Sequence, residues 1–108
     1  MTEQDVVIHT DINGRTVTRH PDDTYSVSFW NTSIHLPFQS GCVGSNGVNG
    51  LYSEQLILLL IDRYNQLNAE LPHGANLEAI AHLNKVLEVQ SNRYAERLEA
   101  GTFGTNNP

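Results

Sequence analysis

The chain has 108 residues, a length that allows one domain or one compact unit with an appendage. Its formal net charge of -6 argues against a general DNA or RNA binder, because affinity for polyphosphate comes mainly from clustered cations. Cys42 is the only cysteine, so an internal disulfide and a thiolate cage around a metal are both excluded. The sequence has no signal peptide and no apolar run that could span a bilayer, and we expect a cytoplasmic protein.

The first forty residues have the pattern of a small antiparallel β-meander. Asn13-Gly14 between two β-prone segments is a strong hairpin signal, and Pro21 with Asp22-Asp23 predicts a second turn. Pro37 has no N–H to donate, so the last strand should lie at a sheet edge if it forms at all. The β-prone segments are residues 6–10, 16–20, 25–30 and 34–36.

Residues 41–52 form a glycine-rich segment with a glycine at every third position from Gly41 to Gly50. Four such repeats without proline cannot build a collagen helix. A phosphate-binding loop would need a Lys-Ser/Thr pair that is missing here. We therefore interpret the segment as a turn-rich connector.

Residues 53–108 are expected to form an antiparallel two-helix hairpin with a polar tail. Ser53 is the expected N-cap of the first helix, and Asn76 that of the second, with Gly101 ending it. Residues 56–61 are apolar on every face of the first helix and need cover on all sides, which neighbouring subunits would supply. The predicted fold is α+β: sheet in residues 1–40, connector in 41–52 and hairpin in 53–108, assembled as an oligomer.

The sequence offers little for catalysis. Its five histidines show neither metal-ligand spacing nor a pattern of carboxylate partners, and Cys42 has no nearby histidine or lysine. Asp22 and Asp23 are ordinary turn acids. The sequence periodicity brings no nucleophile, base and orienting group together. We expect a non-enzymatic protein without a cofactor or a metal site.

Arg93 and Arg97 are the residues with the clearest binding chemistry. They stand four residues apart, so they share one helix face and could form a fork for a phosphate. Tyr94 lies beside them and could stack on a base or on an arginine plane. The alternative is a solvated helix face, with both arginines paired to Glu96, to Glu99 or to acids of a neighbour.

Just over half of the chain carries a combination of motifs that points to a family. The matching residues are Gly47-Val48-Asn49-Gly50-Leu51, Asn76-Leu77-Glu78-Ala79-Ile80, Leu83, Leu87, Arg93, Arg97, Gly101 and Gly104-Thr105. This stretch resembles the hairpin domain shared by phage Thoeris anti-defence proteins of the first family and phage anti-CBASS proteins. The β-rich N-terminal half is more similar to the Thoeris branch.

The resemblance implies a sponge that binds a cyclic nucleotide immune signal tightly without cutting it. For the Thoeris branch the ligand would be glycocyclic ADP-ribose, held between the subunits of dimers or hexamers in the infected cell. By the same resemblance, Arg93 and Arg97 would grip phosphates and Asn76 would hydrogen-bond the nucleoside. Gln66-Leu67 stands where the family has a stacking aromatic, a role that Tyr64 or Tyr94 could take over. Asn49 belongs to the glycine motif of the proposed site.

Three other functions stay open at this stage. The first is a sponge for cyclic di- or trinucleotides of CBASS defence. The second is a protein–protein interaction module in which the apolar hairpin docks on a host protein. The third is a small hydrolase acting on the signal, for which the sequence offers no candidate residues.

Overall fold

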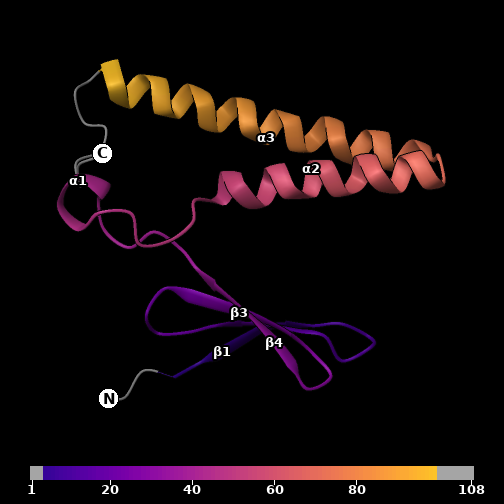
Figure 1. The fold of residues 1–108 in the computed structure, drawn as a ribbon, viewed down its shortest axis with the longest axis horizontal. Helices are drawn as coiled ribbons and strands as arrows, with labels where there is room; N and C mark the ends of the chain where they lie inside the picture. Colours follow the sequence, from indigo (N-terminus) through magenta and orange to yellow (C-terminus); the bar gives the residue numbers. More distant parts are fainter. Residues whose placement is uncertain (1–3, 100–108) are drawn as a thin grey trace. The chain divides into compact units, whose positions relative to one another are not determined.

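The structure is a computed structural model that describes residues 4–99, except for the side chains of residues 94, 95 and 97–99. The chain forms two compact units, one ending at Leu51 and the other starting at Tyr52. An antiparallel four-stranded sheet comes first and helices follow, which confirms the predicted α+β class (Figure 1). The helix end expected at Gly101 and the Gly104-Thr105 motif lie outside the described residues.

The sheet has the simple order β1-β2-β3-β4, with every neighbouring pair antiparallel. Gly14 has the positive φ of 82° that the predicted Asn-Gly turn requires. Pro37 ends β4, which is an edge strand as predicted. The strands are β1 (Val6–Thr10), β2 (Thr16–Arg19), β3 (Thr24–Phe29) and β4 (Thr32–Pro37).

The register gives the sheet two chemically different faces, because directly paired residues point to the same side. One face is mainly apolar and includes the row Val17–Val27–Ile34 across β2, β3 and β4. The opposite face collects hydroxyls and imidazoles: Thr16, Thr18, His20, Ser26, Ser28, Ser33 and His35. Neither face is fully buried within the residues that the structure describes.

The glycine-rich segment, which follows β4 and precedes α2 (Ser53–Glu70) in the chain, is a loop with several internal hydrogen bonds. It contains the four-residue helix α1 (Val43–Asn46), and an isolated parallel bridge pairs Phe38 with Leu51. The Gln39 side-chain amide spans the loop, since its Nε2 donates to the Gly47 carbonyl at 2.9 Å and its Oε1 accepts from the Asn49 N–H at 3.1 Å. These contacts hold the two ends of the loop together.

Gly50 is required by space at this closure. A Cβ on Gly50 would lie 2.6 Å from the Phe38 carbonyl oxygen and 2.7 Å from the Gln39 nitrogen, both backbone atoms that cannot rotate away. We expect Gly50→Ala to lower the free energy of unfolding by about 1–3 kcal/mol, measured by thermal or urea unfolding. Gly74→Ala is the control, because a Cβ there meets nothing within 4 Å. Equal stability of the two variants would contradict this account of the loop.

The second unit is a helical hairpin of α2 (Ser53–Glu70) and α3 (Gly74–Glu99). Both predicted N-caps are wrong. Tyr52 caps α2, and its N–H donates to Gln55 Oε1 at 2.7 Å, so Ser53 is already helical. α3 begins at Gly74 because His73 provides the cap: its Nδ1 accepts a hydrogen bond from the Ala75 N–H at 2.9 Å.

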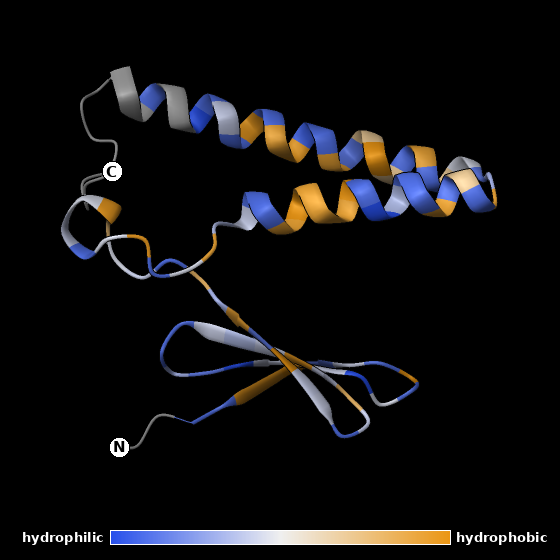
Figure 2. Cartoon of the chain, in the orientation of Figure 1, coloured by the Kyte–Doolittle hydropathy of each residue, from blue (hydrophilic) through white to orange (hydrophobic). Residues whose placement is uncertain are grey.

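The hairpin leaves much of α2 uncovered. No side chain that the structure describes is fully buried, and Leu58, Leu59 and Leu60 are 53%, 59% and 41% exposed. Figure 2 shows this apolar stretch along the first half of α2. α3 therefore covers only part of residues 56–61, which are apolar on every face of α2.

Candidate functional site

Arg93 and Arg97 lie near the C-terminal end of α3. Four residues in an α-helix advance about 6 Å and return to the same face, so the two positions form one ridge. The Arg93 side chain is exposed and makes no ion pair with any side chain that the structure describes. The side chains of Arg97 and Tyr94 fall outside the described part of the chain.

Positions 93 and 97 of α3 lie past the end of α2, the other helix of the hairpin. α2 has 18 residues and α3 has 26, so at about 1.5 Å per residue α3 is about 12 Å longer. Both helices meet at the short loop between Glu70 and Gly74, and the extra length of α3 therefore extends past Ser53 (Figure 1). This overhang, residues 92–99, is a helix segment without α2 against it.

Leu67 and Asn76 lie at the other end of the hairpin, next to the interhelix loop. Both are half-buried, and the neighbouring Asn68 accepts a hydrogen bond from the His73 N–H at 2.9 Å through its Oδ1. Asn76 and Arg93 are 17 positions apart in one helix, which corresponds to about 25 Å. The hairpin therefore brings Leu67 and Asn76 to one end and keeps Arg93 and Arg97 at the other.

Asn49 lies in the N-terminal unit, where its side chain is already engaged. Its Oδ1 accepts from the Ser40 N–H at 2.8 Å and its Nδ2 donates to the Ser40 carbonyl at 2.9 Å. The amide thus pairs with both backbone groups of one residue, as a neighbouring strand would. This geometry makes Asn49 a residue that shapes the glycine-rich loop.

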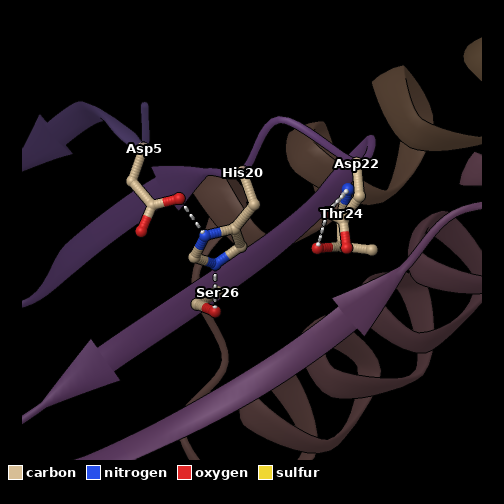
Figure 3. A network of polar contacts seen from close by, with 5 residues as sticks. All are labelled: Asp5, His20, Asp22, Thr24 and Ser26. Carbon is tan, nitrogen blue, oxygen red and sulfur yellow. Dashed lines mark hydrogen bonds and ion pairs between the residues drawn. The ribbon is translucent and has the colours of Figure 1, made fainter. Parts of the chain in front are cut away.

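The sheet contains a polar network that sequence reasoning missed (Figure 3). His20 Nδ1 lies 2.8 Å from Asp5 Oδ1, and His20 Nε2 lies 2.7 Å from Ser26 Oγ. Although the sequence shows no pattern of carboxylate partners for the histidines, the structure pairs His20 with Asp5 and places His82 Nε2 3.6 Å from Glu78 Oε1. Asp5 and Ser26 are 15 and 6 positions from His20 in the sequence. Only the strand register, which pairs Val6 with Arg19, brings the three side chains together.

Among the side chains that the structure describes, Asp11, Asp22 and Cys42 have lowered pKa values, each caused mainly by local hydrogen bonds. The Arg15 N–H lowers the pKa of Asp11, and the Thr24 hydroxyl at 2.6 Å lowers the pKa of Asp22, a turn acid as predicted. Hydrogen bonding from Ser45 lowers the pKa of the Cys42 thiol at the start of α1. Each bond closes a turn or a helix end, so these shifts indicate local structure.

Three further observations concern metal binding, membrane spanning and related proteins, and none of them assigns a function to the chain. Within residues 4–99, no group of three or more His, Cys, Asp or Glu side chains is placed to hold a metal ion. None of the described helices combines the length and apolar character needed to cross a bilayer. A scan against protein-family models and a search of curated proteins both find no match to this sequence.

Proposed function

We propose that this protein is a phage anti-defence sponge that binds and sequesters a cyclic nucleotide immune signal without cleaving it, in the cytoplasm of the infected bacterium. The observation that carries the proposal is the Arg93–Arg97 pair on one face of the α3 overhang. Guanidinium groups bind phosphate oxygens through paired hydrogen bonds, and two of them at this spacing suit a diphosphate. The resemblance to Thoeris anti-defence proteins favours glycocyclic ADP-ribose as the ligand.

The proposed site lies between subunits. A separation of about 25 Å between Asn76 and Arg93 exceeds the span of a small cyclic nucleotide, so one hairpin cannot offer both residues to one ligand. Two hairpins laid antiparallel would place the loop end of one copy beside the overhang of the other. Asn76 in the first turn of α3 would then add a helix N-terminus, which favours anions, to the partner's arginines.

The exposed apolar surface of α2 supports the same arrangement. Leu58, Leu59 and Leu60 are each more than two fifths exposed in the single chain. Burying apolar area contributes about 25 cal/mol per Å². A second copy that covers these residues would therefore stabilise a dimer. Assembly and ligand binding are thus parts of one proposal.

The affinity required of a sponge is consistent with such a site. Competing stoichiometrically with an effector calls for a Kd near 1 nM, about -12 kcal/mol. An enclosed pocket with two arginine forks can approach this value because preorganised groups lose little freedom on binding. An exposed site on a single hairpin would lack that advantage.

Calorimetric titration with a ligand panel tests the proposal. The panel is glycocyclic ADP-ribose, linear ADP-ribose, and cyclic di- and trinucleotides of the kind used by CBASS. We expect tight binding of glycocyclic ADP-ribose and weaker binding of the linear molecule. Tight binding of a cyclic oligonucleotide alone would replace the ligand, and binding of no nucleotide would favour the protein-interaction module.

A further inference from the structure

Beyond the proposed sponge activity, we infer that Ser26 is a base-activated hydroxyl that accepts an acyl group from activated acyl esters. Asp5, His20 and Ser26 form a continuous chain of hydrogen bonds of 2.8 and 2.7 Å on the polar face of the sheet (Figure 3). A nucleophile bonded to a base that is itself oriented by a third group is the arrangement used for covalent catalysis.

The partners of His20 determine where its proton lies. A carboxylate oxygen can only accept, so Asp5 requires that Nδ1 of the neutral ring carries the proton. Nε2 then has a free lone pair and accepts the Ser26 Oγ–H. The imidazole is thus held in the tautomer that can remove the hydroxyl proton.

The network is specific to Ser26 among the hydroxyls of this strand. Ser28 lies on the same face of β3, two residues further on, and its hydroxyl bonds Ser33 at 3.0 Å rather than an imidazole. Ser26 is half-buried, and the His20 side chain is only 24% exposed, which shields the base partly from water. Ser28 is therefore a matched control: a serine on the same face of β3 whose hydroxyl is not bonded to an imidazole.

The reaction follows from these contacts. Ser26 Oγ attacks the acyl carbon while its proton passes to His20 Nε2, a new C–Oγ bond forms, the ester C–O bond breaks, and the leaving oxygen takes the proton from His20. β3 is paired with β2 on one side and β4 on the other, so its N–H groups serve the sheet ladder. Without free N–H groups on β3 to stabilise an oxyanion, both acylation of Ser26 and hydrolysis of the acyl-serine are slow, so we expect acylation only by esters with good leaving groups and no rapid turnover.

A fluorophosphonate probe tests the activated serine on the full chain. In this case Oγ bonds phosphorus, fluoride leaves, and the proton again passes to His20. We expect one adduct per chain, located at Ser26 by peptide mass spectrometry. Labelling should be abolished in Ser26→Ala, unchanged in Ser28→Ala and at least about 100-fold slower in His20→Gln, since general bases contribute that much or more.

Asp5→Asn keeps the test decisive if His20→Gln disturbs the sheet. Asp5 precedes β1 and its side chain is 60% exposed, so the substitution should leave the fold intact, as circular dichroism would verify. It should slow labelling because the amide can donate to Nδ1 and so favour the wrong tautomer. No adduct at Ser26, or equal labelling rates in the wild-type and Asp5→Asn proteins, would overturn the inference.

Discussion

Replacing Arg93 and Arg97 together by alanine is expected to weaken glycocyclic ADP-ribose binding by about 10²- to 10⁴-fold. A hydrogen bond to a charged group contributes about 1.5–3 kcal/mol, and the double variant loses at least one such bond from each arginine. Both positions lie on the overhang of α3, where α2 does not pack, so the helical hairpin should remain folded. Calorimetric titration measures the loss, and size-exclusion chromatography with light scattering measures the oligomer.

Lys85→Ala is the matched control for this experiment. Lys85 is also an exposed cation of α3, and it pairs with Glu88 at 3.3 Å on the helix surface. Exposed pairs of this kind contribute at most about 1 kcal/mol, so Lys85→Ala should change neither assembly nor affinity. Tight binding retained in the double arginine variant would remove both residues from the proposed site.

Mixing two defective variants is expected to restore binding, provided that the site is shared between subunits. One chain carries Asn76→Ala and the other carries Arg93→Ala with Arg97→Ala. In a mixed dimer, one site combines the intact Asn76 of one chain with the intact arginines of the other, and the second site is doubly defective. Co-expressed, doubly tagged dimers should therefore bind one ligand where the wild-type dimer binds two.

The same mixture separates a shared site from a site within one chain. If one hairpin held the whole ligand, every chain in the mixture would carry a broken site and binding would stay absent. Dimers of each variant with itself, purified in the same way, give the baseline. Restored binding above that baseline is incompatible with a site built from a single hairpin.

Local signals in the sequence were sufficient for the fold class and for the two-helix hairpin. Asn13-Gly14 specified the first turn, and Pro37 restricted β4 to the edge of the sheet. The predicted helix starts are wrong because Tyr52 and His73 occupy the N-cap positions, although neither residue type is among the usual N-caps. Residue type alone does not reveal that Tyr52 and His73 take the N-cap positions.

The parts of the site that depend on three-dimensional register could not be predicted. The Asp5–His20–Ser26 network forms only when β1, β2 and β3 pair with the observed register, since a shift by one residue would turn each side chain to the other face. The separation of Asn76 from Arg93 depends on α3 being one continuous helix. The Arg-x-x-x-Arg spacing, by contrast, was evident in the sequence.

The most direct measurement of the central claim is the chemical state of the ligand after binding. The purified protein is incubated with glycocyclic ADP-ribose, washed by filtration and heat-denatured, and the released molecules are identified by mass spectrometry. The proposed function predicts that intact glycocyclic ADP-ribose is retained through washing and released only by heat. Release of a cleaved product, or retention of no ligand at all, would contradict sequestration of an immune signal.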